Sequence, residues 1–326
     1  NSETNTTKAS PGTVKDKAGN TTTCPANQTV RIDKTAPTCK SSGGNSSWTD
    51  ESRTLKGTCS DKGGSGCVGN ISKTFNSETN TTKASPGTVK DKAGNTTTCP
   101  ANQTVRIDKT KPTCKSSGGN SSWTNGSRTI KGTCSDKGGS GCAGNVSKTF
   151  NSETNTTKAS PGTVKDNAGN SATCPANQTV KIDKTAPTCT SSGGNSSWTS
   201  GSRIIKGTCS DKGGSGCAGN VSKTFNSETN TNKASPGTVK DNAGNSTTCP
   251  ANQIVRIDKT KPTCTSSGGS SSWTNSSRIV VGVCSDGGSG CVGNVSKSFT
   301  SQTNSTNISP GTVKDKAGNT TTCPAN

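Results

Sequence analysis

The feature that most restricts the fold of this chain is an internal repeat with a period of 75 residues. The segment NSETN begins at Asn1, Asn76, Asn151 and Asn226, and a fifth copy begins one residue early, at Thr300. The early start reflects a lost lysine, because CSDKGGSGC has become CSDGGSGC at 284–291. A segment that tolerates this deletion is predicted to be a loop. The period is too long for one turn of a solenoid and fits one small domain.

The composition alone would be typical of a disordered chain, with 22% hydrophobic residues, 2% aromatic residues and a formal net charge of +19. The cysteines argue against disorder, because the 17 of them form four sets of four plus Cys24. Even sets predict disulfides made in an oxidising compartment, which stabilise units too small to bury much apolar surface. We therefore expect an extracellular or cell-surface protein, and a segment without membrane insertion that belongs to a longer exported chain.

Alternation of apolar and polar residues predicts short strands. In the segment 127–134, Ile130 and Cys134 share one face, and the copies of this segment place Leu55, Ile205 and Val280 at the inward position. No segment shows an apolar stripe of helical period, so the expected class is all-β with frequent turns. The expected core of one repeat is thin and consists of seven large side chains: Trp123, Ile130, Val146, Phe150, Val164, Val180 and Ile182.

Three motifs carry a resemblance to a known family. DKTAPTC at 33–39, WTNGSRTIKGTCSD at 123–136 and KDNAGN at 165–170 resemble the tandem immunoglobulin-like domains of bacterial surface proteins, and the PTC and AGNxxxC elements are similar to hyalin-type repeats. The resemblance implies a tandem array of small, disulfide-stapled Ig-like β-sandwiches. It also implies domains at 36–110, 111–185, 186–260 and 261–326, the last with an incomplete final strand, and the C-terminal part of a preceding domain at 1–35.

The disulfide pairing is not fixed by the spacing, since four cysteines allow three pairings. Similarity to hyalin-type repeats implies that the first cysteine pairs with the fourth and the second with the third. Pairing Cys39 with Cys59 and Cys67 with Cys99 is the alternative. The implied set is Cys39–Cys99, Cys59–Cys67, Cys114–Cys174, Cys134–Cys142, Cys189–Cys249, Cys209–Cys217, Cys264–Cys323 and Cys284–Cys291.

GSGCVG at 64–69 matches the glycine fingerprint of dinucleotide-binding proteins, and the match recurs in each repeat. That site needs a strand before the glycines and a helix after them, whereas a strand-like run, 70–75, follows here. We interpret the glycines as turn formers. A zinc site is also disfavoured, because the chain has no histidine and no C-x-x-C pair.

Calcium is the more serious metal candidate. Asp61 follows a strand, Asp91 and Asn95 lie in KDKAGN at the same predicted domain end, and Asp33 lies in a linker. Related surface repeats often bind calcium near linkers. Calcium usually takes several carboxylates, however, and Asp and Asn are also common turn formers. The sequence interpretation therefore favours turns and predicts no metal and no cofactor.

The sequence offers no candidate catalytic residues, because the chain lacks histidine and tyrosine and its acidic residues are scattered. A Lys–Asn isopeptide cross-link is conceivable but redundant beside disulfides. Lysine and arginine are spread evenly and stacking aromatics are nearly absent, which argues against a nucleic-acid partner.

The predicted function is mechanical: a stalk or fibre of repeated domains that displays or links other parts of a bacterial surface protein. Partners would be other copies or further repeats, with anionic host or cell-wall glycans as a further candidate. Two alternatives stay open. One is a pilus-like filament in which residues 1–35 complete the unit 261–326 of another chain by strand exchange. The other is an adhesin that binds a ligand through its loops.

Overall fold

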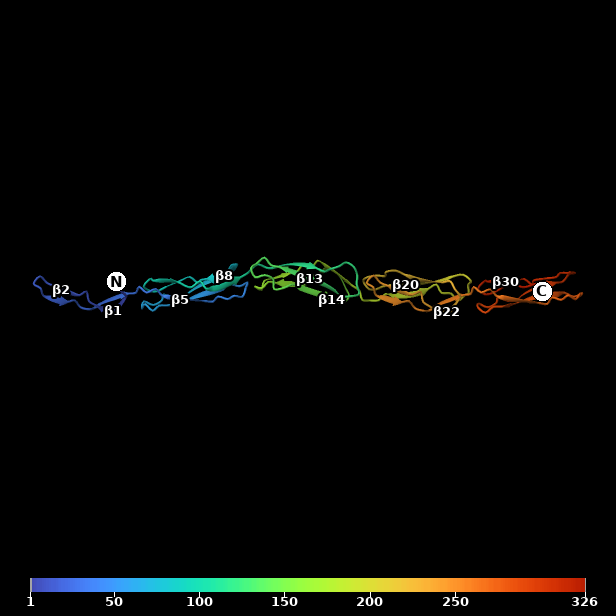
Figure 1. Cartoon of the computed structure of the whole chain (residues 1–326), viewed down its shortest axis with the longest axis horizontal. Helices are drawn as coiled ribbons and strands as arrows, with labels where there is room; N and C mark the ends of the chain where they lie inside the picture. Colours follow the sequence, from blue (N-terminus) through green and yellow to red (C-terminus); the bar gives the residue numbers. More distant parts are fainter. Residues whose placement is uncertain (1, 326) are drawn as a thin grey trace. The chain divides into compact units, whose positions relative to one another are not determined.

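A computed structural model describes residues 2–325, in which short strands alternate with turns and no helix occurs (Figure 1). The predicted all-β class is therefore confirmed. Because the described residues contain no helix, they also contain no helical membrane span. The sequence repeat is a structural repeat as well, since each complete copy contains seven strands in the same order.

The strands are three to eight residues long. The four strands before the first complete repeat are β1 (Thr4–Ala9), β2 (Thr13–Lys15), β3 (Thr21–Thr23) and β4 (Gln28–Ile32). The next seven are β5 (Thr38–Ser42), β6 (Arg53–Ser60), β7 (Ile71–Phe75), β8 (Thr79–Ala84), β9 (Thr88–Lys90), β10 (Thr96–Thr98) and β11 (Gln103–Ile107).

The later strands repeat this order. Residues 111–185 contain β12 (Thr113–Ser117), β13 (Arg128–Ser135), β14 (Val146–Phe150), β15 (Thr154–Ala159), β16 (Thr163–Lys165), β17 (Ser171–Thr173) and β18 (Gln178–Ile182). Residues 186–260 contain β19 (Thr188–Ser192), β20 (Arg203–Ser210), β21 (Val221–Phe225), β22 (Thr229–Ala234), β23 (Thr238–Lys240), β24 (Ser246–Thr248) and β25 (Gln253–Ile257). The final five are β26 (Thr263–Ser267), β27 (Arg278–Ser285), β28 (Val295–Phe299), β29 (Thr312–Lys314) and β30 (Thr320–Thr322).

The strands form several small antiparallel sheets in each repeat. In residues 36–110, β5, β6 and β7 form a three-stranded sheet, while β8 pairs with β11 and β9 with β10. Residues 186–260 repeat this arrangement with the sheet β19-β20-β21 and the pairs β22-β25 and β23-β24. In residues 261–325 the sheet is β26-β27-β28, and β29 pairs with β30.

The core of each repeat is small and lies beneath the central strand of the three-stranded sheet. Alternation along β6 buries Leu55, which packs in one cluster with Ala84, Val105 and Ile107, and Phe75 covers its edge. The equivalent cluster in residues 186–260 consists of Ile205, Ala234, Val255 and Ile257, with Phe225 at its edge. The inward placement of Leu55 and its copies in the sequence analysis is confirmed.

One expected core residue lies elsewhere. Trp123 was expected inside its own repeat, but its indole lies against Gly214 of the following repeat, where an added Cβ would come within 2.6 Å of the ring. Lys181 covers the indole, its Nζ 5.6 Å from the ring centroid. Trp48 and Gly139 make the same contact one repeat earlier. The core prediction was wrong for this tryptophan because it lies in the loop before β13, and its apolar character alone does not show which repeat it packs against.

The described chain divides into two compact units. The first comprises Asn1–Gly119, Thr129–Thr149 and Thr157–Gln178, and the second comprises Asn120–Arg128, Phe150–Thr156 and Thr179–Asn326. The repeats 36–110 and 186–260 each lie wholly within one unit.

Candidate functional site

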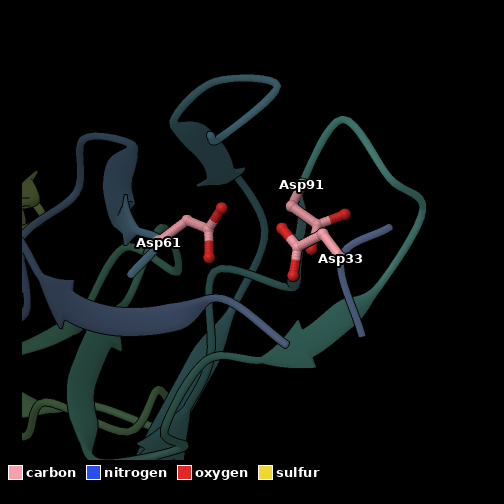
Figure 2. Close-up of side chains that lie close together, drawn as sticks. All are labelled: Asp33, Asp61 and Asp91. Atoms are coloured by element: carbon pink, nitrogen blue, oxygen red, sulfur yellow. The ribbon is translucent and has the colours of Figure 1, made fainter. Parts of the chain in front are cut away.

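Three aspartates that lie far apart in the sequence meet next to the linker that precedes each repeat. Asp33 belongs to the linker, Asp61 directly follows β6, and Asp91 directly follows β9. One carboxylate oxygen from each of the three lies within 4.8 Å of the others. Figure 2 shows the three side chains coming from separate segments, with the carboxylate of Asp61 directed toward those of Asp33 and Asp91.

Asp33 ties the linker to two loops of the repeat that follows. Its Oδ2 accepts a hydrogen bond from the Ser65 amide at 2.9 Å, and its Oδ1 accepts one from the Thr35 amide at 3.0 Å. Its carbonyl oxygen accepts a third from Asn95 Nδ2 at 3.1 Å. The linker therefore holds a defined position against both loops.

Asp61 and Asp91 each fix the loop in which they lie. Asp61 accepts hydrogen bonds from the amides of Gly63 at 2.8 Å and Gly66 at 2.7 Å. The carboxylate of Asp91 is buried and accepts from the backbone amide and the side-chain amide of Asn95, both at 2.8 Å. These are the turn-forming contacts that the sequence interpretation favoured, and the same turns bring the carboxylates together.

The electrostatic state of the linker aspartate follows from these contacts. Hydrogen bonds from the hydroxyl and the amide of Ser65 lower the pKa of Asp33. Burial opposes them with a smaller effect, and the bond from the Thr35 amide, the smallest effect, lowers the pKa further. In the fourth copy burial has the largest effect and would raise the pKa of Asp258, but hydrogen bonds from Ser289 and Thr260 outweigh it and lower the pKa. The linker aspartate is therefore a carboxylate at neutral pH.

Each of the four clusters has the same composition: a linker aspartate, a loop aspartate after the long strand and the aspartate of the KDxAGN turn. They consist of Asp33, Asp61 and Asp91; Asp108, Asp136 and Asp166; Asp183, Asp211 and Asp241; and Asp258, Asp286 and Asp315. In the last three clusters the linker and KDxAGN aspartates are both buried. Three carboxylates so close together repel one another unless a cation lies between them.

Polar atoms without a partner lie in the same clusters. Asp136 Oδ2 in the second cluster and Asp286 Oδ1 in the fourth are buried and have no hydrogen-bond partner. Ser140 is only 8% exposed, and its amide donates to Asp108 Oδ2 at 2.8 Å. Buried carboxylate oxygens normally have a partner, so the second and fourth clusters each have an oxygen atom free for a ligand.

These residues fit a calcium ion better than a zinc ion. Calcium takes oxygen ligands at about 2.3–2.6 Å, so two of its ligands lie at most about 5 Å apart, which the spacing of 4.8 Å or less satisfies. Zinc would require thiolates or imidazoles, but the chain has no histidine and, in the described residues, only Cys24 is outside a disulfide. The residues that would hold the ion are the three aspartates of each cluster.

The other predicted site residues lie in the same part of each repeat. Cys39 is bonded to Cys99 across the sheets, and Cys59 to Cys67 across the loop that contains Asp61. The remaining disulfides repeat these two kinds: Cys114–Cys174, Cys134–Cys142, Cys189–Cys249, Cys209–Cys217, Cys264–Cys323 and Cys284–Cys291.

The glycine motif that resembled a nucleotide fingerprint forms the loop of the aspartate cluster. Gly64 and Gly66 have φ angles of 97° and 79°, a region that favours glycine. The strand β7 follows the loop, where a dinucleotide site would need a helix. The loop also supplies Ser65, the hydrogen-bond partner of the linker aspartate.

Two partners of the linker were not predicted from the sequence. One is Ser65 with its copies, and the other is the glutamate of NSETN. Glu78 Oε1 accepts hydrogen bonds from the Lys109 amide at 2.8 Å and from Thr110 Oγ1 at 3.0 Å, and so supports the next linker. A constant spacing of 31 residues between this glutamate and the linker lysine recurs in the sequence and is the signal that could have suggested the contact.

Comparison with known proteins gives no family. No family model matches the chain, and no curated protein matches it. Among solved structures, the chain is similar to a crystal structure of a tetra-tandem repeat in the extending region of a large adhesion protein, with 17% sequence identity. The match covers 89% of this chain and 98% of that one, with a TM-score of 0.29, which does not establish a common fold.

Proposed function

We propose that this chain is a structural extracellular spacer, a stalk of Ig-like domains that displays or links other parts of a bacterial surface protein. The observation that supports this most is that one joint occurs four times, with its linker aspartate bonded to the next repeat. A joint repeated in this way suits a role in which length and stiffness matter. Two disulfides in each complete repeat suit an extracellular location.

Each joint in this proposal binds one calcium ion between the linker, loop and KDxAGN aspartates. The ion would neutralise the three carboxylates and hold the linker against the loops that Asp33 already contacts through Ser65 and Asn95. The hydrogen bonds of the chain's own residues already fix the position of the linker, and the ion would stabilise the joint further by neutralising the carboxylates.

Calorimetric titration of the chelator-treated chain with calcium tests this proposal. We expect four ions per chain, and three for the variant Asp136→Asn, which removes a carboxylate with an unpartnered oxygen. The matched control Glu51→Gln alters an exposed acid outside the clusters and should still bind four. Absence of binding at millimolar calcium would contradict the ion site and leave the spacer proposal standing.

Electron micrographs of the native protein test the spacer itself. Rods of one length support a stalk, whereas beaded fibres of indefinite length would support the pilus-like filament with strand exchange. An adhesin would instead bind a ligand through loops of these repeats, and a glycan array would detect it. No catalytic role is proposed.

A further inference from the structure

The last three-stranded sheet has an outward surface unlike that of the earlier repeats. On its central strand β27, the outward side chains are Ile279, Val281 and Val283. Ile279 is 51% exposed and Val283 45% exposed, and Val281 is partly exposed. A sheet with one solvated face normally places polar residues there, so three consecutive outward β-branched apolar residues form an exposed apolar patch.

The fold does not require apolar residues at these positions. Residues 36–110 have Thr54, Lys56 and Thr58 in the corresponding places on β6, all exposed. Residues 186–260 are intermediate, with Ile204, Lys206 and Thr208, and Ile204 is 50% exposed there. The change is therefore local to this surface and has no counterpart in the buried core, where Val280 replaces Leu55 as another buried aliphatic residue.

The flanking strands complete a neutral surface, which we call the apolar face. Pairing across the sheet places uncharged hydroxyl residues beside the three apolar ones: Thr265, Ser267, Ser296 and Ser298. In residues 36–110 the same surface carries two lysines, Lys40 and Lys56, in the places of Thr265 and Val281. Both cations have been replaced where the apolar residues occur.

We propose that the apolar face binds the same face of a second copy of this chain. Copies with a formal net charge of +19 repel one another over most of their surface. Across a two-fold contact between identical faces, two lysines on each side would repel most strongly, and here they are absent. An anionic partner would instead be favoured by keeping the lysines, so their loss together with the gain of Ile279 and Val283 points to a neutral, apolar partner such as the face itself.

The size of the face sets the expected strength. Two sheets can pack face to face about 10 Å apart with their side chains interdigitated. Stable complexes bury about 800 Å² per partner, and a face of three strands of five to eight residues is smaller than this. The dimer should therefore be reversible and concentration-dependent. It uses none of the aspartate clusters, so it stands independently of the proposed function.

Sedimentation equilibrium tests the proposal on the chain with Cys24→Ser, since Cys24 is outside any disulfide and could link copies covalently. Measured from about 5 to about 500 µM in chelator, a range that brackets weak protein association, the average mass should rise from 32.7 kDa toward twice that value. Higher salt should strengthen the association, because it screens the repulsion between copies.

Matched variants locate the contact. The combined change Ile279→Thr, Val281→Lys and Val283→Thr restores the residues of 36–110, which the fold accommodates, and should weaken association at least tenfold. Adding Lys40→Thr, Thr54→Ile, Lys56→Val and Thr58→Val to that variant creates the face on the first repeat and should restore association. Mass spectrometry of the eight disulfides confirms folding of each variant.

Three results would overturn the proposal. The first is a chain that stays monomeric over the whole concentration range. The second is an association that the combined change Ile279→Thr, Val281→Lys and Val283→Thr does not weaken. The third is a chain that is monomeric and floats with neutral phosphatidylcholine vesicles, while the same triple variant does not float. That result would identify the face as a lipid-binding surface.

Discussion

At the residue scale, the linker aspartate connects neighbouring repeats through a small number of hydrogen bonds. Asp33 accepts hydrogen bonds from Ser65 in the next loop and from Thr35 in its own linker, while its main chain accepts from Asn95. Hydrogen bonds to a carboxylate are about twice as strong as those between neutral groups. The aspartate is therefore a stronger link than asparagine would be at the same place.

Acid should weaken this link. The pKa of Asp33 is lowered from its ordinary value of 3.8 by bonds from Ser65 and Thr35. The stability it contributes is then fully present above the ordinary pKa and is lost as the pH falls through the lowered pKa. We expect the urea midpoint to fall between pH 5 and pH 3, and to fall less in Asp33→Asn, with Glu51→Gln as the control. An equal pH dependence in all three proteins would contradict the role of Asp33.

A glycine on the central strand shows how closely the sheet packs on a disulfide. A Cβ on Gly57 would lie 2.8 Å from Cys99 Sγ and 2.8 Å from Ile71 Cγ1. Gly57→Ala should therefore destabilise its repeat by about 1–3 kcal/mol, the usual cost of overpacking. Gly69→Ala is the matched control, because an added Cβ there meets nothing within 4 Å.

Trapping of thiols under mild reductant measures this effect in the full chain. The alkylated fraction of Cys39 and Cys99 should rise in Gly57→Ala and stay unchanged in Gly69→Ala. Equal alkylation in the two variants would show that the repeat relaxes around the added methyl group at little cost.

At the element scale, the two disulfides of a repeat act over different lengths of chain. Cys39–Cys99 closes a separation of 60 residues and Cys59–Cys67 a separation of 8. Chain-entropy arguments give the long closure about 4 kcal/mol and the short one about 2.5 kcal/mol. The core cluster of this repeat consists of only four buried side chains, so both disulfides contribute a large part of its free energy of unfolding.

Tryptic mapping without reduction should recover these two pairings directly. Cleavage after lysine and arginine places the four cysteines on the separate peptides 35–40, 57–62, 63–73 and 93–106. We expect 35–40 joined to 93–106 and 57–62 joined to 63–73. A product joining 35–40 to 57–62 would instead support the alternative pairing. The last repeat is an internal control, because its missing lysine leaves Cys284 and Cys291 on one peptide.

Strands were predictable from sequence where their pattern is local, and joints were not. Alternation around Ile130 and its copies predicted the central strand and its buried side. The position of Asp61 and Asp91 at one domain end was also predictable. The contacts of Trp123 with Gly214 and of Ser65 with Asp33 were not, because they depend on how consecutive repeats pack and not on the residues of one strand.

At the scale of the whole molecule, the acids and bases are arranged differently. Twelve of the 19 acidic residues belong to the four clusters at the joints, whereas the 38 lysines and arginines are spread along every repeat. The surface away from the joints is therefore mainly basic. Anionic glycans, the further candidate partners from the sequence, would be held on such a surface by many weak contacts along the chain.

Calcium should strengthen binding to a sulfated glycan if the joints take up the ion. Four divalent ions would add eight positive charges to a chain with a formal net charge of +19. Binding to a polyanion rises with the number of charges neutralised and falls with salt. We therefore expect the chain to elute from immobilised heparin at higher salt in calcium than in chelator.

The control is the combined change Asp61→Asn, Asp136→Asn, Asp211→Asn and Asp286→Asn. This variant should elute at the same salt in both buffers, because it lacks one carboxylate of every cluster. If the unaltered chain elutes at the same salt concentration in both buffers, the prediction is wrong. Glycan binding would then depend on the evenly spread lysines and arginines and not on the joints.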